Sequence, residues 1–224
     1  VKGASDLLVG ATPIIVGSKM YALDTEGFVH AFETQSARKL WVNDFFNSKL
    51  NKSWFSFADT EFINGGISYS DGVLFATAGL GKVVAIDASS GEVLWDVDLS
   101  SPTRTTPLKA KDVLIVQTTD NRTFALDPAS GAVKWTHLGI GEDVSVLATS
   151  APIAKGNTLI IQYTSGEIYA IDADLNVSKF TSVDPQGRRS AIGLTVDTGR
   201  DLLWAVGAAF ELAENADLES ANFT

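Results

Sequence analysis

The sequence predicts an all-β fold, a β-propeller built from four-stranded antiparallel blades. One observation is a repeat in which an acidic residue is followed eight residues later by an aromatic one. Its copies pair Glu33 with Trp41, Asp87 with Trp95, Asp127 with Trp135, and Asp172 with Phe180. The second observation is the period, because these aromatic residues are 54, 40 and 45 residues apart. A period of about 40 to 45 residues with four strands per unit is typical of a propeller blade.

A turn precedes each acidic residue. Six residues before the acid stand Gly27, Gly81, Asn121 and Gly166, residue types that tolerate positive φ. Between this turn and the acid the chain alternates in a way that predicts half-buried strands. These strands are expected over residues 28–32, 82–86, 123–126 and 167–171.

A second turn follows the acid and closes a hairpin. It is clearest in residues 87–91 and 127–131, where the carboxylate can accept backbone N–H bonds and the final glycine can adopt the left-handed conformation. The strand after this turn carries the aromatic residue. Two further strands are expected before each first turn, as in residues 106–108 and 113–116. Each unit is therefore predicted to be a four-stranded meander.

We expect one propeller over residues 1–224, partial because it has about four and a half blades. The expected boundaries are blade 1 about 10–45, an insertion loop about 46–63, blade 2 about 65–99, blade 3 about 104–139, blade 4 about 149–183, an incomplete blade 5 about 190–210, and an acidic tail 211–224. A partial propeller is an open ring. It is expected to be a fragment of a longer gene product, or else two chains close one ring together. A five-bladed ring completed by residues 1–16 is a third alternative.

The repeated aromatic residues are expected to dock one blade on the next. A single blade cannot bury both of its faces, and a large flat ring on the outer strand suits this contact. The predicted structural docking residues are the acids and aromatics of the four copies, namely Glu33, Asp87, Asp127, Asp172, Trp41, Trp95, Trp135 and Phe180.

Composition excludes several kinds of function. The formal net charge is −10, so a nucleic-acid groove is not expected. There are no cysteines, which removes disulfides and thiolate metal sites from these residues. His30 and His137 fall in different blades and are expected to have packing or surface roles, so no metal site is predicted. No phosphate loop or nucleophile motif is present, and no catalytic residues or cofactors are predicted.

Two cassettes, residues 85–95 and 125–135, resemble the repeat shared by quinoprotein dehydrogenases and their non-enzymatic relatives. Within that superfamily, residues 120–127, 135–140 and 144–152 closely resemble the BamB family, with alphaproteobacterial members nearest. BamB proteins are the propeller lipoprotein subunits of the bacterial outer-membrane β-barrel assembly machine.

The resemblance implies a periplasmic location at the outer membrane and a role in protein–protein interaction. BamB-type proteins have eight blades, a lipidated N-terminal cysteine, and a binding site for the periplasmic domains of the barrel-inserting subunit. The resemblance therefore implies this subunit as the partner, together with unfolded outer-membrane protein clients. This chain departs from the family in lacking the lipidated cysteine and in its smaller number of blades.

The resemblance also implies a partner-binding loop between blades 3 and 4. The corresponding stretch is residues 142–149, in which Val144, Val146 and Leu147 match the apolar contact positions. Three large apolar side chains in such a loop suit an interaction hot spot. Packing on their own blade is the alternative. Leu147 stands where the family places an arginine, so the basic contact is not matched.

The expected function is a non-catalytic scaffold for outer-membrane β-barrel protein assembly, with no transmembrane segment of its own. One alternative is a fragment of a quinone (PQQ)-dependent dehydrogenase, since those enzymes share the docking repeat. Such enzymes are similar in carrying a calcium site of carboxylate and amide ligands and a vicinal cysteine pair near the quinone. A chain without cysteine cannot supply that pair. A quinoprotein-like propeller that binds some other protein is the remaining alternative.

Overall fold

The structure is a computed structural model of the 224-residue chain. It describes residues 11–24, 27–44, 65–77, 81–103, 105–139, 151–155, 158–163, 167–172, 177–182, 194–197 and 202–205. The predicted insertion loop, about 46–63, and the predicted acidic tail lie outside the described residues.

The described residues form strands β1 to β18 in four four-stranded antiparallel sheets and one two-stranded sheet. Sheet 1 consists of β1 Ile14–Val16, β2 Lys19–Leu23, β3 Phe28–Glu33 and β4 Lys39–Asp44. Sheet 2 consists of β5 Gly66–Ser70, β6 Val73–Thr77, β7 Lys82–Asp87 and β8 Val93–Asp98. Sheet 3 consists of β9 Leu108–Ala110, β10 Val113–Gln117, β11 Arg122–Leu126 and β12 Val133–Leu138. Sheet 4 consists of β13 Ile153–Lys155, β14 Thr158–Gln162, β15 Glu167–Asp172 and β16 Val177–Ser182, and sheet 5 of β17 Leu194–Asp197 and β18 Leu202–Ala205.

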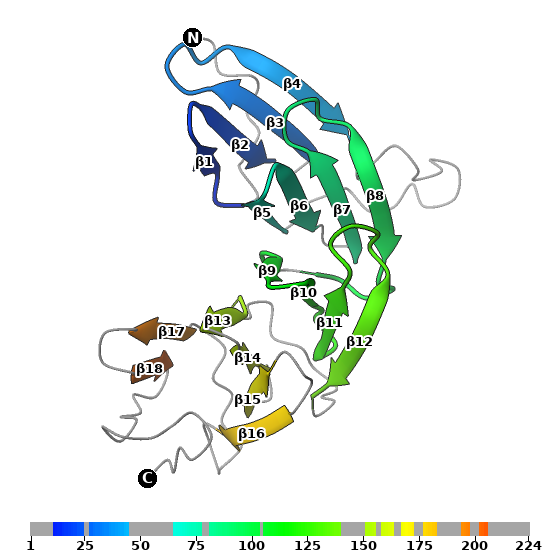
Figure 1. The fold of residues 1–224 in the computed structure, drawn as a ribbon, viewed down its shortest axis with the longest axis vertical. Helices are drawn as coiled ribbons and strands as arrows, with labels where there is room; N and C mark the ends of the chain where they lie inside the picture. The colour runs from blue at the N-terminus through cyan, green and yellow to red at the C-terminus, as the bar shows by residue number, and fades with distance from the viewer. Residues whose placement is uncertain are drawn as a thin grey trace, which may run out of the picture. The chain divides into compact units, whose positions relative to one another are not determined.

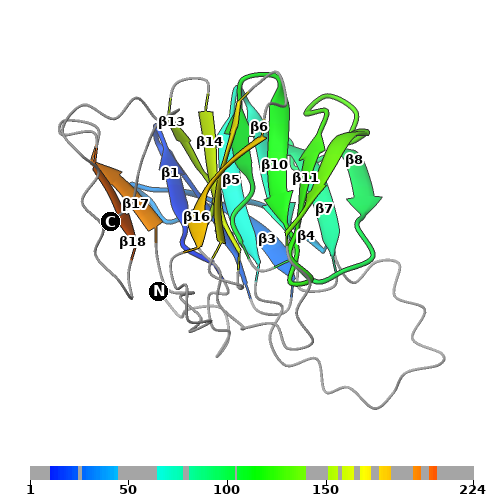
Figure 2. The ribbon, with the colours of Figure 1, turned by 90° about the horizontal axis from the view of Figure 1, so that it is seen from below.

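Each four-stranded sheet is a meander in which strands that are neighbours in sequence are also hydrogen-bonded neighbours (Figures 1 and 2). This confirms the predicted all-β class and the predicted four-stranded units. Short hairpin turns permit this order, because antiparallel strands can be joined by very few residues.

The chain divides into two compact units. The first consists of Val1–Pro107 with Pro128–Ala132, and the second of Leu108–Asp127 with Val133–Thr224. The short turn of residues 128–132 therefore belongs to the first unit, although the strands on both sides of it belong to the second.

The turn before the acid has the predicted backbone conformation in the three copies that the structure describes. The φ angles are +88° at Gly27, +88° at Gly81 and +60° at Asn121. Only glycine and, less readily, asparagine or aspartate adopt this region at low cost. Residue type thus explains why the same turn recurs.

A β-bulge marks the hairpin after the acid. In sheets 1 to 3 the register shifts immediately after the alanine that pairs with the tryptophan, in the pairs Ala31–Trp41, Ala85–Trp95 and Ala125–Trp135. The bulge places one extra residue in the outer strand and increases its local twist.

The fourth copy departs from this register. In sheet 4 the shift lies between Ile168 and Tyr169, and Ala170 pairs with Ser178. Phe180 therefore does not face the repeated alanine as the three tryptophans do. Equal spacing in sequence predicted equivalence here, whereas the backbone pairing differs.

The core of the first unit lies between sheets 1 and 2. Sheet 1 contributes Tyr21, Leu23, Val29 and Ala31, and sheet 2 contributes Ile67, Leu74, Ala76, Val84, Ile86 and Ala88. Trp41 packs against this cluster. In the second unit, buried side chains of sheets 3 and 4 form a corresponding cluster of Ile115, Ala125, Leu159, Ile161, Tyr163 and Ile171.

Candidate functional site

The second turns of sheets 2 and 3 each receive the tryptophan of the preceding sheet. The Trp41 indole N–H donates a hydrogen bond to Ala88 O at 3.3 Å, and its ring lies on Gly91, where a Cβ would approach ring carbons to 2.7 Å. Trp95 makes the same contact in the first unit. It donates to Pro128 O at 2.9 Å and covers Gly131, where a Cβ would come within 2.6 Å.

We call such a turn, with its carbonyl acceptor and its residue of positive φ, a tryptophan seat. The φ angle is +78° at Gly91 and +74° at Gly131. Glycine is needed there for two independent reasons, the left-handed backbone and the space that the ring occupies. The tryptophan adds an oriented hydrogen bond to apolar burial, so the contact fixes direction as well as distance.

The acid at the start of the seat organises the turn locally. Asp87 Oδ1 accepts four hydrogen bonds, from Ser89 N at 2.9 Å, Ser89 Oγ at 2.6 Å, Ser90 N at 2.8 Å and Ser90 Oγ at 3.0 Å. These hydrogen bonds lower the pKa of Asp87 to about 2, because they stabilise the ionised carboxylate. The Ser89 hydroxyl contributes most, followed by the Ser90 N–H, the Ser90 hydroxyl and the Ser89 N–H. The carboxylate thus stays ionised and holds the turn closed.

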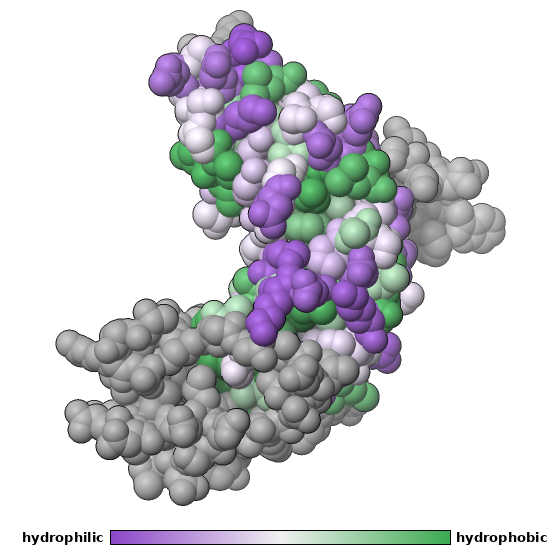
Figure 3. Space-filling model, in the orientation of Figure 1, coloured by the Kyte–Doolittle hydropathy of each residue, from purple (hydrophilic) through white to green (hydrophobic). Residues whose placement is uncertain are grey.

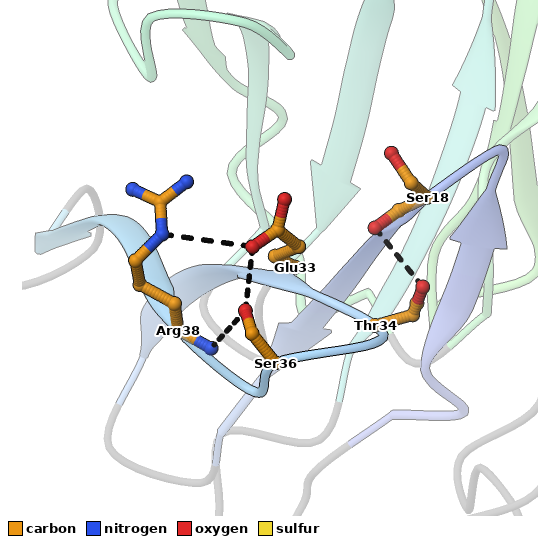
Figure 4. A network of polar contacts seen from close by, with 5 residues as sticks. All are labelled: Ser18, Glu33, Thr34, Ser36 and Arg38. Carbon is orange, nitrogen blue, oxygen red and sulfur yellow. Dashed lines mark hydrogen bonds and ion pairs between the residues drawn. The ribbon is translucent and has the colours of Figure 1, made fainter.

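Glu33 has the same role in the first copy (Figure 4). Its Oε2 accepts from Ser36 Oγ at 2.5 Å and lies 3.6 Å from Arg38 Nε. The Ser36 hydroxyl and then the Arg38 charge lower the pKa of Glu33. In the third copy, Asp127 Oδ2 lies 3.1 Å from Lys134 Nζ. Glu33 and Asp87 are therefore turn residues, and Asp127 pairs with a lysine of the strand that follows its turn.

The remaining docking residues are described less completely. Trp135 packs against the cluster of the second unit. The turn that would receive it, residues 173–176, lies outside the described residues. Asp172 and Phe180 lie in β15 and β16, and their side chains are likewise outside what the structure describes. Their docking role stays a prediction.

The predicted partner loop is also outside the described residues, so Val144, Val146 and Leu147 remain predictions. β12 ends just before this loop. Its last residue, Leu138, is 61% exposed, the second most exposed of the large apolar side chains described. The only signal for Leu138 in the sequence is its place four residues before the loop.

Exposed large apolar side chains also occur elsewhere, namely Val133 on β12 itself and Ile15, Val42, Tyr69, Val93 and Leu94 on other strands. Figure 3 shows hydrophilic and hydrophobic residues interspersed over the described part of the face in view. Single exposed apolar residues are normal on protein surfaces. Exposed apolar residues indicate an interaction surface only where several of them lie together on one face of a sheet.

Both histidines make polar contacts that their sequence positions did not predict. His30 Nε2 lies 2.7 Å from Asp24 Oδ2, and Asp24 Oδ1 accepts from Phe28 N at 2.9 Å. In the second unit, Tyr163 Oη lies 2.7 Å from His137 Nδ1 and 2.9 Å from Thr123 Oγ1. Tyr163 and Thr123 are buried, so this network satisfies polar atoms inside the second unit.

In the part of the chain that the structure describes, no group of three or more His, Cys, Asp or Glu side chains could hold a metal ion. Within the same residues, no helix is long and apolar enough to span a membrane.

A family model and several known sequences match this chain. The model described as outer membrane protein assembly factor BamB matches residues 25–189. An uncharacterized protein of Rickettsia prowazekii is 28% identical over 163 residues, which is 72% of this chain and 37% of that protein. BamB of Moranella endobia is 24% identical over 169 residues, which is 75% of this chain and 43% of that protein. The chain thus spans less than half the length of these relatives.

Solved structures show the same fold. BamB from Moraxella catarrhalis matches with a TM-score of 0.70 at 22% identity, over 90% of this chain and 60% of that one. Quinohemoprotein alcohol dehydrogenase from Comamonas testosteroni matches with a TM-score of 0.70 at 18% identity, over 97% of this chain and 42% of that one. The four sheets are therefore propeller blades, as the sequence predicted.

The seat geometry predicts a large difference between two glycine substitutions. Gly91→Ala places a methyl group against the Trp41 ring and also strains φ, whereas Gly72→Ala, at φ +86° with nothing within 4 Å, strains φ alone. We expect Gly72→Ala to cost about 1 kcal/mol and Gly91→Ala about 2–4 kcal/mol of unfolding free energy. Urea unfolding followed by Trp fluorescence measures both. Equal costs would show that the ring does not rest on Gly91.

The lowered pKa of Asp87 predicts a specific acid response. A carboxyl group whose folded pKa is depressed stabilises the fold fully above its unfolded pKa and loses that contribution as pH falls toward the folded value. For Asp87 this window runs from about 4 down to about 2. We expect the melting temperature of the wild type to fall more steeply across this window than that of Asp87→Asn, with the two converging at its lower end. Asp98→Asn, which removes the same charge from β8, serves as the control.

Proposed function

Because the chain belongs to the family of the outer membrane protein assembly factor BamB, we propose that it is a non-catalytic scaffold in outer-membrane β-barrel protein assembly. The family match over residues 25–189 carries this proposal. The proposed partners are the periplasmic domains of the barrel-inserting subunit and its unfolded clients, and the proposed location is the periplasm at the outer membrane.

The architecture supports a scaffold role. The acids of the described seats are committed to their own turns, and the tryptophans are committed to the neighbouring repeat. These contacts stiffen the sheets and leave the connecting loops as the variable part. Loops positioned by a rigid framework are where proteins commonly place binding residues.

The loop of residues 142–149 is the proposed contact site, with Val144, Val146 and Leu147 as its apolar centre. The exposed Leu138, four residues before the loop, extends this apolar stretch. A few well-packed, desolvated residues near the centre of an interface supply most of its binding energy.

A capture experiment tests this site. We expect the double substitution Val144→Asp/Leu147→Asp to abolish capture of the periplasmic domains of the barrel-inserting subunit, because two buried charges would replace apolar contacts. The matched control is Val93→Asp/Leu94→Asp, whose side chains are 45% and 53% exposed on another sheet. Circular dichroism confirms that both variants fold. Undiminished capture by the first variant would remove the loop from the interface.

A second candidate function is a fragment of a quinone-dependent dehydrogenase. The likeness to the quinohemoprotein alcohol dehydrogenase, over 97% of this chain, favours it. The same blade architecture serves both families, so the fold does not separate them. Only a test of quinone binding separates the dehydrogenase from the scaffold.

Titration with the quinone and calcium decides between the two functions. We expect no saturable change in the fluorescence of the five tryptophans, because a scaffold offers no quinone site. Free tryptophan amide at the same absorbance corrects for the light that the quinone absorbs. Saturable quenching that requires calcium would favour the dehydrogenase and contradict the scaffold.

A further inference from the structure

Sheet 3 ends in a cross-strand pair of an arginine and a leucine. Arg122 at the start of β11 lies directly opposite Leu138 at the end of β12. Directly opposite residues lie on one face of a sheet, with their Cβ atoms about 5 Å apart. The Arg122 side chain is 49% exposed, and Leu138 is 61% exposed. A positive charge and an apolar surface therefore lie side by side on the second unit.

The corresponding position in both sheets of the first unit is acidic. The outer strand ends at Asp44 in sheet 1 and at Asp98 in sheet 2. Asp98 lies opposite Lys82, whose Nζ is also 3.5 Å from Asp96 Oδ2. Sheet 3 keeps a cation on the inner of the two strands, but a leucine replaces the acid opposite it. Arg122 thus lacks the cross-strand carboxylate that Lys82 has.

The turn before β11 orders Arg122 and leaves donors for a partner. Asp120 Oδ2 lies 3.2 Å from Arg122 Nε, and Asp120 Oδ1 accepts from Thr118 Oγ1 at 2.5 Å. A guanidinium has five N–H donors, so a contact through Nε does not occupy all of them. A side chain that is ordered before binding loses less conformational entropy when a partner arrives.

This pair borders the proposed contact loop, residues 142–149. Gly139 N donates to Asn121 O at 2.8 Å, which joins the chain that enters the loop to the residue before Arg122. Val144, the first apolar residue of the proposed contact, lies five residues beyond Gly139, so at most about 18 Å separates their Cα atoms. The exposed leucine of the pair is therefore close to the apolar residues of the loop.

The charges of the loop indicate what Arg122 adds to the contact. The loop contains Glu142 and Asp143 but no lysine or arginine, so Arg122 supplies a cation that the loop itself does not have. An apolar contact flanked by a cation is complementary to an apolar segment flanked by a carboxylate. Arginine is also enriched among the residues that contribute most to binding energy.

We propose, on the basis of the proposed scaffold function, that Arg122 and Leu138 extend the contact site of residues 142–149. Their partner is an apolar segment with a carboxylate side chain on the periplasmic domains of the barrel-inserting subunit. Arg122 pairs with the carboxylate, and Leu138 packs against the apolar part of the same segment.

The test is the dissociation constant of this chain for those periplasmic domains, measured by calorimetry over a range of salt. Arg122→Gln should raise it about five- to tenfold at low salt, and Leu138→Ala should raise it about threefold or more. Arg122→Gln should also make binding less dependent on salt between about 0.05 and 0.5 M, because one ion pair is lost. Arg122→Lys keeps the charge and should recover most of the salt dependence.

Two residues at the other end of β12 provide matched controls. Lys134→Gln removes a cation that is likewise ion-paired, with Asp127 Oδ2 at 3.1 Å, and Val133→Ala truncates a side chain that is 50% exposed. Both controls should bind as the wild type does. Circular dichroism confirms that every variant folds.

The outcomes separate this inference from the function on which it rests. If Val144→Asp/Leu147→Asp abolishes binding while Arg122→Gln and Leu138→Ala bind as the wild type does, this inference alone is wrong. No binding by the wild type would contradict the proposed function, and this inference with it.

One further variant tests whether Arg122 serves a partner or its own loop. Glu142→Gln/Asp143→Asn removes the carboxylates of the loop and should leave the dissociation constant unchanged or lower it. An increase as large as that of Arg122→Gln would show that the arginine pairs with its own loop, which would overturn the proposal.

Discussion

The contact between an indole ring and the glycine of the next turn is the constraint on which the rest of this structure depends. A four-stranded meander has two faces and cannot bury both by itself. The ring removes apolar area from water, and the N–H to carbonyl hydrogen bond fixes the direction of the contact. Without a residue lacking Cβ at positions 91 and 131, neither ring could approach so closely. The spacing of the tryptophan and of the glycine along the chain thus determines how one sheet meets the next.

Much of this could be predicted from the sequence, because its causes are local. The spacing of acid and aromatic residue predicted the hairpins, and the glycine or asparagine six residues earlier predicted the positive φ angles at Gly27, Gly81 and Asn121. Both depend on the conformational preferences of single residues and short turns. The carbonyl acceptors of Trp41 and Trp95 were beyond sequence reasoning, since a backbone oxygen has no residue signature.

The fourth repeat shows where spacing fails as a guide. The acid and the aromatic residue are eight apart there as elsewhere, but the bulge has moved and Phe180 has lost the pairing that the tryptophans share. Pairing between strands depends on the loop that joins them and on packing of both faces, which residue spacing does not record. The Asp24–His30 pair and the Tyr163 network were missed for a related reason. No repeated spacing links these residues in the sequence, although their side chains are in contact in the structure.

The order of the strands has a consequence for how the protein forms. Among the strands that the structure describes, every hydrogen-bonded pair joins neighbours along the chain, so a sheet can assemble from its own residues alone. The seat of Trp41 arrives 47 residues later, and that of Trp95 arrives 33 residues later. Until those turns have formed, the indoles of Trp41 and Trp95 have no seat and stay exposed on their newly formed sheets. Exposed apolar surface of this kind is what makes folding intermediates prone to aggregation.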